Sequence, residues 1–252
     1  MMRDIKTLVY CDLEATGLKR SGRPRISELS LVAINIEDVL ELNSQLKIQL
    51  QKSGHAIESM LPRVMNKLTI CVYPMSIIRP EVSEITGLDN YNLSGQSTFD
   101  KSTGELINYF LARLPRPLCL VAHNGDLYDF PLLKAELEKA KTTLLTKTLC
   151  ADSYVGIREI FQRREWGTQQ QNHSTSKKRM NITKKDSPRS YSLINLHKHL
   201  LGRYPTQSQG AEADCLTLLR ITAVLGREWL DWLQDNCQLF SNCQSMWSLK
   251  EC

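Results

Sequence analysis

The sequence lacks any hydrophobic run of about 18 residues or more, so no segment has the character of a membrane-spanning helix. Its first residues lack the profile of a secretory signal peptide, and its eight cysteines are scattered without a C-x-x-C pair. We therefore expect no disulfide framework, no membrane partner, and residence in a reducing compartment, nuclear or cytoplasmic or both.

The composition is that of an ordinary globular protein. Hydrophobic residues make up 42% and charged residues 23% of 252 residues, a length that favours one domain with a well-formed core. The net charge of +5 is compatible with a polyanionic partner but is a weak signal alone.

Short apolar runs alternate with helical patterns along the chain. They predict strands at residues 8–13, 26–36, 66–72, 118–122 and 148–152. Helical spacing of apolar residues predicts helices at residues 103–114, 130–139, 153–162, 193–200 and 213–225. This order predicts an α/β fold, a mixed sheet flanked by helices.

Residues 163–189 are polar and lack apolar periodicity, so we expect a mobile basic loop within the single domain of residues 1–252. The basic residues in and beside it are Arg158, Arg163, Arg164, Lys177, Lys178, Arg179, Lys184, Lys185 and Arg189. A flexible basic arm can hold phosphates without reading bases. A solvated loop or a nuclear-import signal has the same composition.

Two acidic residues end the first predicted strand. Asp12 and Glu14 are two positions apart, so both side chains would point to the same face of the strand. A D-x-E pair is a weak signal, because a solvated strand end gives the same pattern. The small-residue turn at residues 15–17 favours a site, since it lets backbone approach a ligand closely.

Two further aspartates stand near predicted helix starts. Asp129 follows the strand at residues 118–122, and Asp214 lies near the start of the last long helix. Capping of a helix N-terminus is the alternative interpretation for both. Four carboxylates in one pocket would repel one another without cations, and hard divalent cations prefer oxygen ligands. Two such ions clamp the reacting oxygens in phosphodiester cleavage, which is the chemistry this set predicts.

Five segments carry a more specific pattern: residues 12–18 (DLEATGL), 83–88 (SEITGL), 120–133 (LVAHNGDLYDFPLL), 190–193 (SYSL) and 211–214 (AEAD). In these segments the chain resembles the three-prime repair exonucleases, a group of the DEDDh 3′–5′ exonucleases, over residues 6–225. The resemblance implies a ribonuclease-H-like fold with a mixed five-stranded sheet. It also implies removal of nucleotides from DNA 3′ ends.

The resemblance implies residue roles as well. The ligands of two Mg²⁺ ions, with Mn²⁺ as a substitute, would be Asp12, Glu14, Asp129 and Asp214. The substrate-binding residues would be Ala15, Leu18, Ile85, His123, Asn124 and Tyr128.

Within that second set, Ile85 would act as a wedge against the last base and Tyr128 would pack against the nucleotide. An apolar wedge and an aromatic wall suit a single-stranded end, because stacking tolerates any base. Core packing is the alternative for Leu18 and Ile85. A homodimer through the edge strand at residues 67–72 is implied too.

One position departs from this pattern. The resemblance requires a histidine five residues before the last aspartate, as the general base, and Gln209 stands there. Glutamine has no basic site at neutral pH, and losing a general base costs about 10²- to 10⁴-fold in rate. Three interpretations stay open: a slow enzyme, a protein that only occupies 3′ ends, or a variant residue in an active enzyme. Rescue by His197 or His199 is disfavoured.

We therefore predict a metal-dependent 3′–5′ exodeoxyribonuclease of DNA repair or degradation that acts on single-stranded or frayed 3′ ends. Its catalytic residues would be Asp12, Glu14, Asp129, Gln209 and Asp214, with activity weakened by Gln209. The alternatives are an impaired 3′-end-binding protein and an RNA-processing exonuclease of the same fold.

Overall fold

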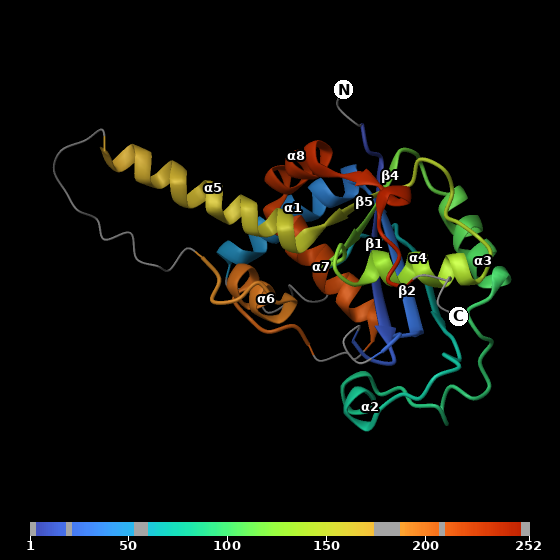
Figure 1. Ribbon diagram of the computed structural model, residues 1–252. Helices are drawn as coiled ribbons and strands as arrows, with labels where there is room; N and C mark the ends of the chain where they lie inside the picture. Colours follow the sequence, from blue (N-terminus) through green and yellow to red (C-terminus); the bar gives the residue numbers. More distant parts are fainter. Residues whose placement is uncertain (1–3, 19–21, 53–59, 174–186, 207–209, 248–252) are drawn as a thin grey trace.

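One mixed sheet forms the centre of the protein, in a computed structural model that describes residues 4–18, 22–52, 60–173, 187–206 and 210–247, and of residues 167–173 the backbone alone. Its strand order is β3-β2-β1-β4-β5-β6 (Figure 1). The strands are β1 (Thr7–Ala15), β2 (Ile26–Asn35), β3 (Asn66–Cys71), β4 (Leu118–Ala122), β5 (Leu149–Asp152) and β6 (Gln238–Leu239). β1 lies in the interior of the sheet, antiparallel to β2 and parallel to β4.

Helices cover both faces of this sheet (Figure 1). They are α1 (Ile36–Gln51), α2 (Pro80–Thr86), α3 (Lys101–Ala112), α4 (Asp129–Lys139), α5 (Ser153–His173), α6 (Leu193–Leu201), α7 (Ala211–Leu225) and α8 (Arg227–Asn236), with a 3₁₀ turn, η3 (Phe240–Asn242). Side chains of β1 alternate between two cores. Leu8 and Tyr10 pack with α1 and α7, whereas Val9 and Cys11 pack with α3 and α4.

Buried polar contacts fix α7 on its face of the sheet. The hydroxyl oxygens of Tyr10 and Thr222 lie 2.7 Å apart in the core. At the C-terminal end of α7, the amide of Asn43 donates to the carbonyls of Ala223 at 2.6 Å and Val224 at 3.0 Å. Those carbonyls belong to the last turn, whose acceptors have no partner within the helix. α1 thereby satisfies the end of α7.

All five predicted strands are present, but the prediction of a five-stranded sheet is one strand short. β6 contains two residues, too few for an alternating pattern to be visible in the sequence. Three helices were also not predicted: α1, α2 and α8. For α1 the signal was there, because Val39, Leu42 and Leu46 recur at near-helical spacing and are buried.

The loop prediction for residues 163–189 is wrong at its start. α5 continues to His173, so residues 163–173 are helical although few of them are apolar. Residues 174–186, which hold the lysines of the expected basic arm and Arg179, lie outside the described residues. Of the helices described, none has both the length and the hydrophobicity to cross a membrane.

We expect Asn43→Ala to lower the free energy of unfolding by about 1–3 kcal/mol, because it leaves buried carbonyls at the end of α7 without donors. Urea denaturation followed by circular dichroism measures this change. Gln45→Ala, on the exposed side of the same helix, is the matched control. Equal stabilities of the two variants would contradict the role given to Asn43.

Candidate active site

Asp12 and Glu14 interrupt an otherwise buried strand. They are the two half-buried residues of β1, and every other residue of that strand is buried. Because they are two positions apart, they continue the face on which Leu8 and Tyr10 pack against α7. The prediction that both carboxylates share one face is therefore confirmed.

Asp129 reaches the same region from the opposite layer. It is the first residue of α4, after a turn that leaves β4, and its side chain is 5% exposed. Because β4 runs parallel to β1, the two strands end at the same edge of the sheet. The capping interpretation is wrong for this residue, since the N-cap position belongs to Tyr128 and no side chain caps the helix.

Asp214 comes from the first turn of α7. Burial raises its pKa above the ordinary value. The N-cap of α7 is Gly210, so Asp214 does not cap its helix either.

These carboxylates form one electrostatic cluster. Burial, followed by the charges of Asp129, Asp214, Glu14 and Glu28, raises the pKa of Asp12 well above its usual range. Burial, with Asp214 and Glu28, raises the pKa of Glu14 to about 7. Burial is also the main reason that the pKa of Asp129 rises to about 8. Each group disfavours the charge of its neighbours.

The donor set suits hard divalent cations, which take carboxylate oxygens and would offset the mutual repulsion. Within the described part of the chain, no three acidic, histidine or cysteine side chains are already assembled as a metal centre. The carboxylates of β1, α4 and α7 interact electrostatically but do not form a closed ligand sphere. They are the residues that could hold cations.

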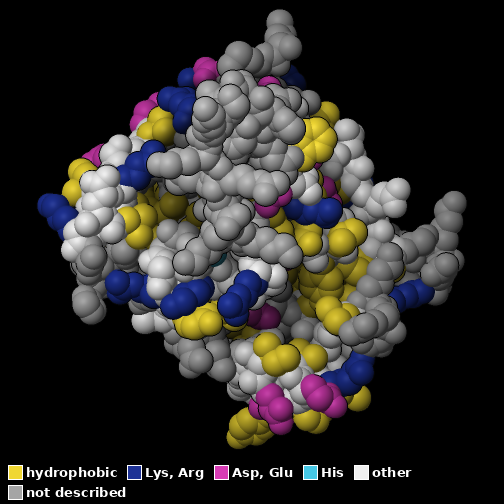
Figure 2. All heavy atoms as spheres, turned by 90° about the vertical axis from the view of Figure 1, so that its left-hand side faces the viewer, with side chains coloured by type: hydrophobic (Ala, Val, Ile, Leu, Met, Phe, Trp, Pro, Cys, Tyr) yellow, Lys and Arg dark blue, Asp and Glu magenta, His cyan; other side chains and the backbone are white. Residues whose placement is uncertain are grey.

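A pocket of about 520 Å³ opens beside the cluster. Its lining residues are Leu13, Glu14, Ala15, Gly17, Leu18, Arg79, Glu81, Val82, Ile85, Thr86 and Tyr128. Figure 2 shows hydrophobic side chains gathered in a hollow of the face it presents, with acidic side chains nearby. Four of the six predicted substrate-binding residues, Ala15, Leu18, Ile85 and Tyr128, thus lie in one pocket with Glu14.

Two of the pocket residues are large hydrophobic side chains in open positions. Leu18 is 51% exposed and Ile85, which α2 carries, is 74% exposed. Core packing, the alternative for both, is therefore wrong. α2 projects beyond the ends of the central strands (Figure 1).

Hydrogen bonds fix the turn that follows β1. The hydroxyl of Tyr128 donates to the carbonyl of Gly17 at 2.5 Å, which joins this turn to the start of α4. Arg25 forms a bidentate ion pair with the buried carboxylate of Glu136, at 2.6 and 2.9 Å. A charged pair of this geometry is strong and directional. This ion pair ties Arg25, which directly precedes β2, to α4.

His123 and Asn124 have other partners. The Nε2 atom of His123 lies 2.7 Å from the carbonyl of Tyr191, which can only accept, so Nε2 carries the proton. Nδ1 lies 2.9 Å from the hydroxyl of Ser153. Burial lowers the pKa of His123, in keeping with a neutral ring. Neither His123 nor Asn124 lines the pocket, and the ring holds the turn after β4 in place.

Asp152 is a site residue that sequence reasoning missed. Its carboxylate is buried at the end of β5 and accepts backbone N–H bonds from Asn124 at 2.9 Å, Asp126 at 3.2 Å and Tyr154 at 2.8 Å. It therefore shapes the turn that delivers Asp129. The signal was available, because the predicted strand at residues 148–152 ended in an aspartate.

Gln209 lies outside the described residues. Of the two histidines considered for rescue, His197 is fully buried and its Nδ1 lies 2.8 Å from the carbonyl of Arg203. His199 makes an edge contact with the ring of Phe161. Both contacts place these rings among α5, α6 and the segment after α6.

The fold and the acidic cluster define a class of protein, the ribonuclease-H-like α/β proteins with a carboxylate-rich site at the ends of central strands. Exonuclease I has this fold: a solved structure superposes with a TM-score of 0.62 at 13% identity, over 90% of this chain and 43% of that chain. A structure of E. coli exonuclease I with a dA16 oligonucleotide gives 0.57 at 12% identity, over 90% and 43%. This chain thus spans less than half the length of exonuclease I.

Curated relatives identify the family. Three-prime repair exonuclease 1 of Bos taurus is 35% identical over 246 residues, 96% of this chain and 71% of the relative. Three prime repair exonuclease 2 of Mus musculus is 33% identical over 244 residues, 96% of this chain and 93% of the relative. No protein-family model matches. The chain belongs to the three-prime repair exonuclease family.

We expect Asp12→Asn to raise the melting temperature of the cation-free protein at pH 8 by at least about 2 °C. Between the ordinary pKa of Glu14, 4.5, and its raised value of about 7, the folded state binds more protons than the unfolded state. The free energy of unfolding is therefore highest below this pH window and falls as pH rises through it. Removing the charge of Asp12 makes this fall smaller.

Thermal denaturation in EDTA at pH 5 and pH 8 measures this effect, and the gain should be smaller at pH 5. Asp235→Asn, on the exposed surface of α8, is the control. A lower melting temperature for Asp12→Asn at pH 8 would contradict the electrostatic cluster.

Proposed function

We propose that this chain is a metal-dependent 3′–5′ exodeoxyribonuclease that releases nucleotides from single-stranded or frayed DNA ends. One observation carries the proposal: the cluster of carboxylates with raised pKa values borders a pocket with exposed apolar walls. An end of a polyanion can bind there only if cations offset the carboxylates. Membership of the three-prime repair exonuclease family supports the same activity.

In this proposal Asp12, Glu14, Asp129 and Asp214 hold two Mg²⁺ ions, with Mn²⁺ as a substitute. When bound, such ions supply positive charge that stabilises an in-line phosphoryl displacement. The protein contributes position. β1 and α4 present their carboxylates from adjacent layers, and Asp152 fixes the turn before Asp129.

The pocket suits the terminal nucleotide of a single strand. Leu18 and Ile85 offer exposed apolar surface to a base, and base stacking on such surfaces tolerates sequence. Tyr128 is held by Gly17 and forms a fixed wall. His123 and Asn124 support the turn beside the pocket. In keeping with this, the fold neighbour exonuclease I of E. coli has been solved with a dA16 oligonucleotide.

A homodimer through β3 is the second part of the proposal. β3 is the edge strand of the sheet and is paired on one side with β2. A second copy of the chain could extend the sheet by pairing along this edge. Such a dimer would act in DNA repair or degradation, in the nucleus, the cytoplasm or both.

Gln209 limits the rate in this proposal. A glutamine can orient a water molecule but cannot accept its proton. The carboxylates are all present, so cation binding and capture of a DNA end would persist while proton removal is slow. A protein that only binds 3′ ends is the second candidate, favoured by this one position.

We expect Gln209→His to raise nucleotide release from a 3′-labelled single-stranded DNA in Mg²⁺ by about 10²- to 10⁴-fold. Gln209→Ala should leave the residual rate nearly unchanged, and Asp12→Ala should abolish release in either background. DNA-end affinity, measured in parallel by fluorescence anisotropy, separates capture from turnover. If both the wild type and Gln209→His bind ends without releasing nucleotides, the chain is a binding protein and the proposed activity is wrong.

A further inference from the structure

Glu28 is a fifth carboxylate of the site that no motif marks. It lies on β2, directly opposite Glu14 in the antiparallel pair of β1 and β2. Like charges at opposite positions of a strand pair repel. Glu28 also contributes to the raised pKa values of Asp12 and Glu14. A carboxylate in this costly position needs a compensating contact.

That contact is the first N–H group of α7. The Oε2 atom of Glu28 accepts a hydrogen bond from the backbone N–H of Ala211 at 2.7 Å. The first N–H groups of a helix have no partner within the helix, and its N-terminus favours negative charge. A carboxylate of the sheet thereby caps a helix that is 183 positions away in the chain.

Gly210 makes this approach possible. Its φ of +107° is a conformation that side-chain-bearing residues rarely adopt, and a Cβ atom there would lie 3.0 Å from Oε2 of Glu28. The backbone N–H of Asp214 also returns to the carbonyl of Gly210 at 3.4 Å. The first turn of α7, which ends at Asp214, is thus seated directly on Glu28.

We propose that Glu28 is a positioning residue, which fixes the first turn of α7 so that Asp214 faces Asp12 and Glu14. Asn43 secures the other end of the same helix, so the two contacts together set its position along the sheet. Because its Oε2 atom accepts from Ala211 and its Oε1 atom accepts from the thiol of Cys71 at 3.8 Å, Glu28 acts through α7 and is not a cation ligand. The catalytic meaning of this role rests on the proposed function.

Two substitutions separate position from charge. Glu28→Gln keeps an oxygen that can accept from Ala211, whereas Glu28→Ala removes it. Glu37→Ala, which deletes an exposed carboxylate from the first turn of α1, is the control. Hydrogen exchange of the Ala211 amide, followed by nuclear magnetic resonance, reports on the contact itself. Titration with Mn²⁺ alone, followed by electron paramagnetic resonance, reports on the carboxylates without substrate.

We expect Glu28→Ala to speed exchange at Ala211 by about tenfold or more and to weaken Mn²⁺ binding by about tenfold. Glu28→Gln should keep both values near those of the wild type, as should Glu37→Ala. Unchanged exchange in Glu28→Ala overturns the proposal. So does equal loss of Mn²⁺ affinity in Glu28→Gln and Glu28→Ala, which would make Glu28 a ligand. If the wild type binds no Mn²⁺, the proposed function fails, and exchange at Ala211 still decides the contact.

A separate observation concerns two cysteines that do not line the pocket beside Glu14. The sulfur atoms of Cys150, on β5, and Cys243, after η3, lie 3.4 Å apart. Cys150 is fully buried and Cys243 is 8% exposed. Either thiol can donate to the other in this contact. Of the two residues, Cys243 is the more exposed and is therefore the one that a dissolved oxidant reaches first.

We infer that Cys150 and Cys243 are a modification site for hydrogen peroxide. The Cys243 thiolate attacks one peroxide oxygen, which gives a sulfenic acid and, after proton uptake, one water. Cys150 then displaces the hydroxyl as a second water, so two thiols are oxidised and one peroxide is reduced. The disulfide would join β5 to the C-terminal segment.

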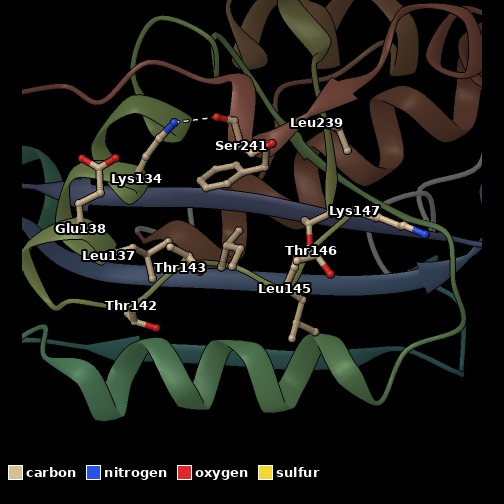
Figure 3. Close-up of a pocket in the computed structure, with 13 residues that line it drawn as sticks. Lys134, Leu137, Glu138, Thr142, Thr143, Leu145, Thr146, Lys147, Leu239 and Ser241 are labelled. Carbon is tan, nitrogen blue, oxygen red and sulfur yellow. Dashed lines mark hydrogen bonds between the residues drawn. The ribbon is translucent and has the colours of Figure 1, made fainter.

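That segment also packs on α4. Lys134 of α4 donates to the carbonyls of Ser241 at 2.8 Å and Cys243 at 2.5 Å. Figure 3 shows Lys134 pointing to Ser241 beside an apolar pocket of about 370 Å³ between α4 and this segment. Oxidation would therefore lock one wall of the pocket to the sheet.

Peptide mapping by mass spectrometry without reduction tests this site, on wild-type protein treated with one equivalent of hydrogen peroxide. We expect a Cys150–Cys243 cross-link and a melting temperature higher by about 10 °C, both reversed by dithiothreitol. Cys71, which contacts Glu28, should stay reduced and serves as the internal control. Recovery of Cys150 and Cys243 as thiols, or oxidation of Cys71 first, overturns the inference.

Discussion

The seating of α7 on β1 is the constraint on which the rest of the site depends. β1 carries Asp12 and Glu14 on the face that packs against this helix, and the helix carries Asp214. The buried contact between Tyr10 and Thr222 holds the middle of the interface. If the helix slid by one turn, about 5.4 Å, the carboxylates would no longer face one another.

Burial at this interface has two opposing effects on stability. Apolar burial stabilises the packing of α7 on the sheet, yet it also removes water from the carboxylates at the end of that packing. The acids respond with raised pKa values instead of full charge. A site prepared in this way gives up stability in the absence of cations, and the large core on both faces of the sheet tolerates that loss.

In the proposed function, Gln209 separates cation binding and nucleotide capture from proton removal. Cation binding and nucleotide capture depend on carboxylates and on the apolar pocket, all of which the chain retains. Removal of a proton from the attacking water needs a base, which glutamine lacks. The described histidines near α6 are engaged elsewhere, His197 with Arg203 and His199 with Phe161. In the proposed function, the chain therefore keeps capture and weakens turnover.

Sequence reasoning reached the elements with a clear period and the residues in local motifs. The five longer strands, the common face of Asp12 and Glu14, and the departure at Gln209 all follow from neighbouring residues. It missed the two-residue β6 and the helical start of residues 163–189, because their local composition gives no periodic signal.

The sequence by itself determined which carboxylates are present, on which strand face two of them lie, and that a glutamine stands at position 209, where the resemblance implies a histidine. Only the tertiary structure decided that Ile85 is exposed, that His123 supports a turn, and that Glu28 caps α7. The physical reason is distance along the chain. Glu28 and Ala211 are 183 positions apart, and only the packing of helix on sheet brings them together.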